Sequence, residues 1–452
     1  MVPAVRQFFD HGGTRLWVVR VSSNARGPVL RLPAGQSALL LRAAEPGAME
    51  RIRAAVDYDG LDDAEDRFNL TLQRLDPVTG TVVDQELFAA LSPDAAEPEF
   101  VGDALRRSSI ARVDGPLPER RPDATLRGDN RYDLAWVDCP FEAGSDGGTL
   151  SDYDLVGSRD GRNGIFALED VEHFDLLYLP PRGAERDPGP AAILAAELYC
   201  RRRNAMLILD PPYACESVQS VVASIDDAGY ASPNMISYFP RAVLRGATGG
   251  GAPEAIGGAI AGLISRLDSR HGRWAGLETG ACRLAAGLLP AMQLDDGDKL
   301  MLARAGFNIV GREAAGRHAV TGSRTLSRGG ESHGIFRSLP VRRLYLQVVT
   351  AIDLATRWTV FSEVDGEVAD RLCSRIREYL ARLYEMGALQ DEACVVRCEP
   401  GVPGNPQGQG SRGVTLHLAF RPRECPVSVS LTVHQAASGF RVASPAFAPA
   451  GG

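Results

Sequence analysis

The middle of the chain alternates between short apolar runs and longer helical segments. The pattern predicts strands at 174–179, 206–209 and 235–239, separated by helices at 190–203 and 215–227. Strands that alternate with helices in this way form a parallel sheet, because each return of the chain needs a crossover connection. Such strands are covered on both faces. We therefore predict an α/β fold with a central, mostly parallel sheet and helices on both of its faces.

The segment upstream of this region has a different pattern. From about 28 to 113, short alternating runs are broken by turn sequences, which favours an outer, β-rich insertion with mostly antiparallel strands. Before it, Val5 to Phe9 predict the end of a helix, with Gly12 and Gly13 as its stop. The run from Leu16 to Val21 then predicts a buried strand.

The last third of the chain predicts a C-terminal α+β domain. Helices are expected at about 340–357 and 366–387, and three strands near Ala393, Val414 and Pro426. The expected domains are residues 1–24 as the first part of the central domain, 25–118 as the outer insertion, 119–290 as the central α/β domain, 291–435 as the inner α+β domain, and 436–452 as a flexible tail or linking arm.

Composition points to protein partners. The 452 residues are 44% hydrophobic and 23% charged, which is enough apolar material for several cores. The net charge of −8 disfavours attraction to nucleic acid or to an anionic membrane. The sequence starts without a signal-peptide pattern and lacks a run of about 18 apolar residues, so we expect a cytoplasmic protein without membrane insertion. Its eight cysteines lack C-x-x-C spacing, and we expect them to be reduced.

The sequence contains no enzyme signature. Asp210 ends a predicted strand, where α/β enzymes place catalytic carboxylates, but such a residue more often caps a turn. The glycines from Gly249 to Gly251 lack the spacing of a phosphate-binding loop. The seven histidines are far apart in the sequence, so no metal site and no cofactor is expected. A cytosolic α/β enzyme with a site at Asp210 and the glycine loop stays open as an alternative.

The predicted helix at 366–387 has two distinct faces. Its apolar stripe is expected to be core: Leu372, Ile376, Tyr379, Leu380 and Leu383. Arg371, Arg375 and Arg382 fall within roughly 40° of one another on an adjacent face. This arginine edge is either a solvated flank or a docking edge toward an acidic partner.

Residues spread along the chain match, in the same order, the positions that the members of a known protein family share. Near the start, Phe8, Phe9, Gly12 and Gly13 precede the run from Val18 to Val21. The later matched positions are Gly306, Asn308, Gly322, Arg324, Thr325, Leu326, Arg342, Arg343, Leu344, Trp358 and Phe361. In this order and spacing the chain resembles the contractile tail sheath proteins of phages and of phage-derived injection systems. Segments such as LSDYDLVG and NGIFALEDVEHFDLLYLP extend the resemblance over nearly the whole chain.

The resemblance implies a structural subunit that is not an enzyme and needs no cofactor. It would polymerise helically around an inner tube through strand exchange, and contract to drive the tube through a target envelope. Implied partners are further copies of the chain, the inner tail tube protein, and baseplate and tail terminator proteins. The implied location is the cytoplasm during assembly and then a phage tail or tail-like particle.

The resemblance also assigns roles to residues. The helix that carries Arg371, Arg375 and Arg382 corresponds in position to the sheath segment that touches the tube. Six further family-pattern positions are expected to be structural: Gly12, Gly13, Arg324, Arg342, Arg343 and Trp358. Sheath proteins normally open with a strand-forming arm before the segment matched by Phe8 and Phe9, and this sequence starts without one. We therefore expect either a longer natural start or a divergent or accessory subunit with fewer linkages. An accessory sheath-like subunit that does not polymerise stays open as a further alternative.

Overall fold

The structure is a computed structural model that describes residues 2–62, 66–126, 135–183, 185–245, 252–277, 282–285, 287–312, 318–328, 334–361, 364–392, 394–401, 413–423, 425–436, 439–443 and 445–449. The chain divides into two compact units. The first comprises Met1–Val19 and Leu155–Gly452, and the second comprises Arg20–Asp154. Each unit has a core of its own.

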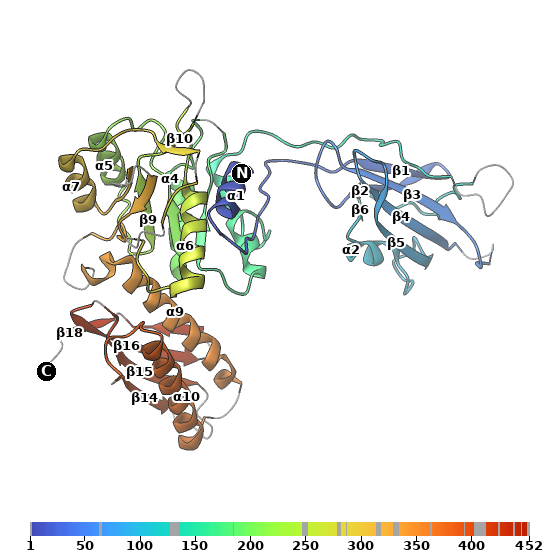
Figure 1. Cartoon of the computed structure of the whole chain (residues 1–452). Helices are drawn as coiled ribbons and strands as arrows, with labels where there is room; N and C mark the ends of the chain where they lie inside the picture. The colour runs from blue at the N-terminus through green and yellow to red at the C-terminus, as the bar shows by residue number, and fades with distance from the viewer. Residues whose placement is uncertain are drawn as a thin grey trace. The chain divides into compact units, whose positions relative to one another are not determined.

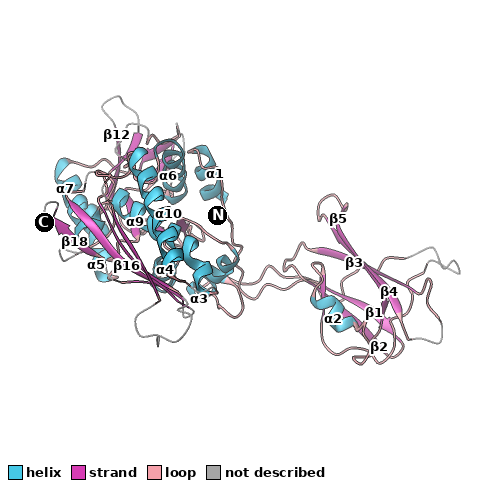
Figure 2. Cartoon of the chain, turned by 90° about the horizontal axis from the view of Figure 1, so that it is seen from below, coloured by secondary structure: helices cyan, strands magenta, loops and turns pink. Residues whose placement is uncertain are grey.

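The second unit is built from two antiparallel sheets. One sheet has the order β1-β2-β6, formed by Val29–Ala34, Ser37–Ala43 and Ala111–Val113. The other has the order β3-β4-β5, formed by Arg51–Asp57, Phe68–Leu75 and Val82–Leu91 (Figure 2). A short helix, α2 (Val101–Arg106), packs beside β5 and β6. Both sheets contribute side chains to one core, as the sequence pattern of this β-rich region predicts.

The first unit contains the predicted parallel sheet, with strand order β13-β12-β9-β8-β7. Strands β7 (Leu176–Tyr178), β8 (Met206–Leu209), β9 (Met235–Phe239) and β12 (Asn308–Arg312) are parallel to their neighbours, and β13 (His318–Thr321) is an antiparallel edge strand. Every residue of β8 and β9 is buried. The prediction of a mostly parallel sheet is therefore confirmed.

Helices cover both faces of this sheet. Leu207, Leu209 and Phe239 point to the face covered by α4 (Pro190–Arg202), α5 (Val218–Asp227), α7 (Asp296–Ala305) and the 3-10 helix η1 (Gly164–Asp170). Met206 and Ile236 point to the opposite face, covered by α6 (Gly257–His271) with α1 (Val2–Asp10) beside it (Figure 1). The alternation follows from the two-residue period of a strand. Two short strands, β10 (Ala242–Leu244) and β11 (Leu288–Pro290), pair separately.

The C-terminal part of the first unit is α+β. After η2 (Ile335–Arg337), the long helix α9 (Leu339–Thr356) runs into η3 (Arg357–Val360), and α10 (Gly366–Glu385) follows. The antiparallel sheet contains β14 (Val395–Pro400), β15 (Val414–Phe420), β16 (Val427–Ala436) and β17 (Gly439–Val442), and β18 (Ala446–Pro449) also pairs with β16. Residues expected to form a flexible tail or linking arm thus contribute two strands.

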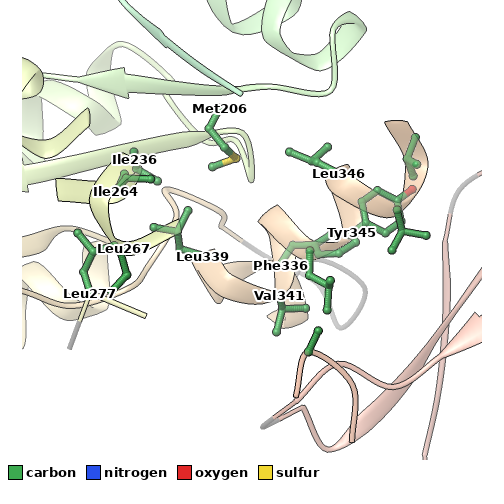
Figure 3. Close-up of a cluster of buried hydrophobic side chains, with 14 of the residues drawn as sticks. Met206, Ile236, Ile264, Leu267, Leu277, Phe336, Leu339, Val341, Tyr345 and Leu346 are labelled. Carbon is green, nitrogen blue, oxygen red and sulfur yellow. The ribbon is translucent and has the colours of Figure 1, made fainter. Parts of the chain in front are cut away.

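The start of α9 joins the central sheet to the C-terminal sheet in one continuous core. Leu339 lies toward Ile236, Ile264 and Leu267 of the central layers (Figure 3). On the other side, the ring of Phe336 meets that of Phe447 in β18 at 5.4 Å. The start of α9 and the preceding η2 therefore join the two sheets of the first unit.

One predicted strand is wrong. Residues 14–22 form no strand, and Leu16, Trp17 and Val18 are 38%, 56% and 53% exposed. The run has strand-like composition, but no strand among the described residues pairs with it. It spans the boundary between the two units at Val19 and Arg20. An apolar, β-branched run without a partner strand stays irregular.

The short helix α3 (Asp152–Val156) spans the other end of the second unit. None of its residues is buried, and the side chain of Tyr153 is 79% exposed. Its first turn is acidic, with Asp152 and Asp154. Asp154 accepts hydrogen bonds from the backbone N–H and the hydroxyl of Ser151, at 2.7 and 2.6 Å, which cap the helix. The helix is thus fixed locally while its aromatic side chain stays in solvent.

Candidate interaction surfaces

The family-pattern glycines end α1 against α6. The backbone N–H of Gly13 donates to the carbonyl of Phe8 at 2.9 Å, and Gly12 has a φ of +94°, which favours glycine. A Cβ atom at Gly262 of α6 would overlap the carbonyl oxygen of Phe8, so the two helices meet backbone to backbone. The small residues of α6 therefore allow this close packing.

The paired arginines of the family pattern are buried structural residues. Arg343 forms a bidentate pair with Asp268 at the end of α6, and its side chain is only 3% exposed. Arg342 donates to the side-chain oxygen of Asn234 at 2.6 Å and lies over the ring of Phe336 at 4.6 Å. Burial lowers the pKa of Arg342 to about 10. These contacts tie α9 to the central domain.

Arg324 has a backbone role. Its N–H donates to the side-chain oxygen of Asn308 at 2.8 Å, and its carbonyl accepts from the side-chain nitrogen of Asn308 at 2.9 Å. Arg324 also forms an isolated bridge with Ser338, directly before α9. The matched turn therefore connects β12 to the start of α9.

Asp210 has a structural role at the start of α6. Its carboxylate accepts the backbone N–H groups of Ile256 and Gly257 at 3.1 and 3.0 Å, and also the hydroxyl of Tyr178. It therefore binds the N-terminus of α6, where the helix dipole favours an anion. Burial raises the pKa of Asp210. The enzyme alternative placed Asp210 next to Gly249–Gly251, and those three glycines lie outside the described residues.

The described chain offers neither a metal-binding cluster nor a membrane-spanning helix. Within the described ranges, no group of three or more His, Cys, Asp or Glu side chains is arranged to hold a metal ion. No helix in those ranges combines the length and apolarity needed to span a bilayer. All eight cysteines lie in the described ranges, and none of them forms a disulfide bond there.

The arginine edge of α10 lies in solvent. Arg371, Arg375 and Arg382 are exposed, while Leu372, Ile376, Leu380 and Leu383 are buried and Tyr379 is half-buried. Arg371 lies 3.5 Å from Glu367. Arg377, on the opposite side of the helix, instead donates to the carbonyl of Val396 in β14 at 2.9 Å. The predicted core stripe is confirmed, and a tube contact at the arginine edge stays a prediction.

An apolar stripe, here called the open stripe, continues α9 into η3. Its members are Leu354, Trp358 and Phe361, which are 42%, 41% and 84% exposed. Their spacing of four and three residues places them on one helix face. The indole N–H of Trp358 is satisfied by the carbonyl of Ala355 at 2.8 Å, so the exposed ring presents apolar surface. Trp358 was expected to be structural, and the structure places it at this surface.

The same face of α9 forms the floor of a groove of about 1120 Å³. Gln347, Thr350, Ala351 and Leu354 line the floor at helical spacing. The side-chain oxygens Oε1 of Gln347 and Oγ1 of Thr350 are buried without a hydrogen-bond partner in the described structure. Buried polar atoms of this kind are rare in folded proteins. Both oxygens lie beneath the surface of the groove, because neither is accessible to solvent.

The walls of the groove are basic. Residues 268–276, from the end of α6 onward, form one wall, and Tyr379, Met386 and Arg423 line the other side. Asp268 is the only acidic residue of the described lining, and it is paired with Arg343. Arg270 and Arg423 are exposed and have no ion-pair partner among the described residues. The groove therefore carries positive charge above an apolar floor.

The sequence analysis missed this groove. Its floor residues Gln347, Thr350 and Ala351 interrupt an otherwise apolar helix at i, i+3 and i+4, which is a detectable signal of a second face. Its walls come from segments distant in sequence, so no local pattern could have located them.

The comparisons with known proteins bear on the fold. No known family profile matches the sequence, and no curated protein matches it either. The sheath tail protein of Desulfitobacterium hafniense aligns at 13% identity over 91% of this chain and 82% of its own, with a TM-score of 0.46. The helical sheath of the anti-feeding prophage in the contracted state aligns at 18% identity over 91% and 95%, with a TM-score of 0.46.

A third solved structure covers less of the chain. The sheath complex of PVC, an extracellular contractile injection system in the contracted state, aligns at 19% identity over 57% of this chain and 71% of its own, with a TM-score of 0.44. All three are sheath proteins.

Proposed function

We propose that this chain is a subunit of a contractile tail sheath, which polymerises helically around an inner tube and contracts to drive the tube through a target envelope. The ordered series of family-pattern residues supports this proposal. Gly12 and Gly13 end α1 at its contact with α6, and Arg343 ties α9 to α6. Residues far apart in the sequence thus stabilise the contacts of α6 with α1 and α9.

The observation that carries the proposal is the number of separate apolar surfaces on the first unit. Leu194 and Leu198 are 48% and 47% exposed on α4, and Leu300 and Met301 are 53% and 39% exposed on α7. The open stripe on α9 and η3 is a third such surface. Exposed apolar clusters usually mark protein interfaces. Because these surfaces differ from one another, they suit heterologous contacts, which generate open helical assemblies.

Contraction in this proposal is a rigid-body change between two packings of the same subunits. The continuous core through α9 makes the first unit suitable as the rigid body. Subunits would be linked by strand exchange at the C-terminal sheet. One edge of that sheet, β14, is partly occupied, because the carbonyl of Val396 accepts from Cys373 at 3.3 Å and from Arg377 at 2.9 Å. The strand exchange is therefore proposed for the edge formed by β17 and β18.

The proposed partners are further copies of the chain, an inner tube protein, and baseplate and terminator proteins. The α10 edge of Arg371, Arg375 and Arg382 would face the tube, because exposed arginines suit an acidic partner. The subunit would assemble in the cytoplasm and then be part of a phage tail or tail-like particle.

Electron microscopy tests the proposal. The chain is co-expressed with the tube protein encoded beside it, and the product is examined by negative stain. Striated hollow cylinders around a tube are the expected result. A product that stays monomeric with and without the tube protein would contradict a polymerising sheath subunit, and would favour the accessory, non-polymerising alternative.

A further inference from the structure

Helix α10 and strand β14 bring two cysteines into contact. Cys373 lies on the buried face of α10 and is only 4% exposed. Its thiol donates to the carbonyl of Val396 in β14 at 3.3 Å. Cys398 lies two residues further along β14, so its side chain points to the same face of the sheet as that of Val396. The thiol of Cys398 is hydrogen-bonded to that of Cys373, so two sulfur atoms from different elements meet.

We infer that Cys373 and Cys398 form a reversible disulfide bond, which joins α10 covalently to β14 when the chain meets a small disulfide as oxidant. Both thiols are free in the structure. Only the time of oxidation rests on the proposed function. A subunit made in the reducing cytoplasm would later belong to a particle that acts on a target envelope, outside that compartment. The bond itself depends on the contact of the two thiols within one chain.

The surroundings of the pair keep the two thiols aligned. Arg377, one turn after Cys373 on α10, donates to the same carbonyl of Val396 at 2.9 Å. Both cysteines pack on one apolar core, which holds α10 against β14. A disulfide needs Cα atoms within about 7 Å and side chains that point toward each other. Since the two thiols are already in contact, the bond requires little movement of the backbone.

The cysteine nearest to Cys398 in the sequence is the wrong partner. Cys394 lies directly before β14, and four residues of extended chain span about 13 Å. A disulfide joins Cα atoms that are at most about 7 Å apart. The fold therefore selects Cys373, which comes from another element and which no local sequence pattern indicates.

The bond forms by thiol–disulfide exchange. Cys398 is half-buried, so its thiolate is the one that reaches the oxidant. It attacks one sulfur atom of the small disulfide, whose other half leaves as a thiolate. The thiolate of Cys373 then attacks the sulfur of Cys398 and releases the second half of the oxidant. Two protein thiols thus lose two electrons and two protons, and the oxidant takes them up to become two small thiols.

The charges around Cys398 make this reaction slow at neutral pH. Burial raises the pKa of the Cys398 thiol, and the hydrogen bond with Cys373 raises this pKa further. Asp370 on α10 acts in the same direction, while the guanidinium of Arg377 opposes it. Because the thiolate is the attacking species, exchange at Cys398 becomes faster as the pH rises. Oxidation is therefore a slow step that follows folding.

The bond would stabilise the contact between α10 and the C-terminal sheet. It closes the loop that contains the second half of α10 and the connection to β14. A closed loop of this kind has less conformational entropy to gain when it opens, so opening becomes rarer. The exposed face of α10 carries Arg371, Arg375 and Arg382, whose position relative to the sheet would then be fixed covalently.

Oxidation of the full-length, folded chain tests the inference. The reduced chain is incubated with oxidised glutathione at about pH 8.5, where an ordinary thiol is half ionised, and its free thiols are then alkylated. Mass spectrometry should find peptides that link Cys373 to Cys398 and that dithiothreitol separates. Cys139 is exposed and should carry glutathione in the same sample, which shows that the oxidant is active. Modified Cys139 without the linked peptides would overturn the inference.

Single variants test the order of the two steps. Cys373→Ala should leave Cys398 joined to glutathione, because no second thiol completes the exchange. Cys398→Ala should leave Cys373 unmodified, because Cys373 is buried. Cys394→Ala is the matched control, since Cys394 is also half-buried and lies beside the same strand, and it should keep the linked peptides. Loss of these peptides in the Cys394 variant would contradict Cys398 as the first thiol to react.

Amide hydrogen exchange measures whether the bond holds α10 to β14. Exchange in both elements should slow at least about tenfold on oxidation and recover with dithiothreitol. Helix α5, which packs in a different core, should keep its rate, and Cys373→Ala should show no slowing. Equal rates in α10 and β14 before and after oxidation would overturn the stabilising role. The unassembled chain is used throughout, so a negative result leaves the sheath proposal standing, and a chain that never polymerises still tests the bond.

Discussion

The first unit contains two regions that use family-pattern residues in opposite ways. At the contacts of α6 with α1 and α9, here called the junction, Phe8, Gly262, Asp268 and Arg343 are packed or paired within the chain. At the open stripe, Trp358 is 41% exposed and Phe361 is 84% exposed. The comparison shows that the same sequence pattern contains residues that the fold buries and residues that it leaves exposed. Under the proposed function, variants in the first region should affect folding and variants in the second should affect assembly.

The largest expected effect is at Arg343. Arg343→Met removes one member of a buried ion pair and leaves the carboxylate of Asp268 uncompensated, so the free energy of unfolding should fall by about 3–5 kcal/mol. Chemical denaturation followed by circular dichroism measures it. The double variant Arg343→Met with Asp268→Asn should recover part of the loss, because no unpaired charge remains. A single variant as stable as the parent chain would show that the pair does not stabilise the junction.

The next effect is at Gly262, where α1 and α6 meet. Gly262→Leu places a side chain where the carbonyl of Phe8 already lies, so α1 must move, and we expect a loss of about 1–3 kcal/mol. Gly183→Leu, at an exposed loop position with open space around it, is the matched control. Limited proteolysis should release α1 from the Gly262 variant alone. Equal protection of α1 in both variants would contradict close packing as the reason for this glycine.

The open stripe should behave in the opposite way. Phe361→Ser should change the free energy of unfolding by no more than about 0.5–1 kcal/mol, because the side chain of Phe361 is 84% exposed. The same variant should weaken polymer formation, measured by sedimentation with the tube protein. Thr359 lies two residues earlier and is buried, so Thr359→Val is an opposite control that should affect stability more than assembly. If the stripe variant unfolds instead, the region belongs with the junction.

The arginine edge of α10 predicts a smaller and salt-dependent effect. Arg375→Glu with Arg382→Glu should weaken co-sedimentation with the tube protein, while the melting temperature of the subunit stays the same, because both side chains are exposed. The control Asp370→Arg changes the charge of the same helix on another face, because Asp370 is exposed and lies about 120° around the helix from Arg382. Unchanged docking of the double variant at low salt would leave the edge as a solvated flank.

The sequence predicted the buried elements better than the surfaces, for a physical reason. The strands Met206–Leu209 and Met235–Phe239 have the predicted bounds, because burial on both faces makes every residue apolar. The core stripe of α10 follows from its helical period. The segment from Leu16 to Val21 has the same apolar character but lacks a partner strand, and composition alone does not contain that information.

The candidate surfaces depend on tertiary contacts in the same way. Leu354, Trp358 and Phe361 repeat at helical spacing, as a core stripe does, and only the fold reveals that they stay 42%, 41% and 84% exposed. The groove joins the end of α6, one face of α9 and Arg423, which are far apart in the sequence. Asp210 shows the converse, because its position suggested a catalytic group and the structure uses it to bind the N-terminus of α6.

The smallest expected effect is a pH dependence of the free energy of unfolding, which arises from a histidine at the junction. His11 is buried beside α6, where its Nδ1–H donates to the carbonyl of Gln7 at 2.7 Å and its Nε2 accepts from the N–H of Ala285 at 3.0 Å. Burial lowers the pKa of His11 below its usual 6.5, so the folded state favours the neutral ring. The stabilisation is complete above pH 6.5 and is lost as the pH falls below it, because the unfolded chain then binds the proton more readily.

The free energy of unfolding should fall by at most about 1.4 kcal/mol per pH unit through this group. In His11→Gln that slope should be smaller, whereas His271→Gln, at an exposed position, should keep it. Parallel pH profiles for the parent chain and His11→Gln would show that this histidine does not couple the junction to pH.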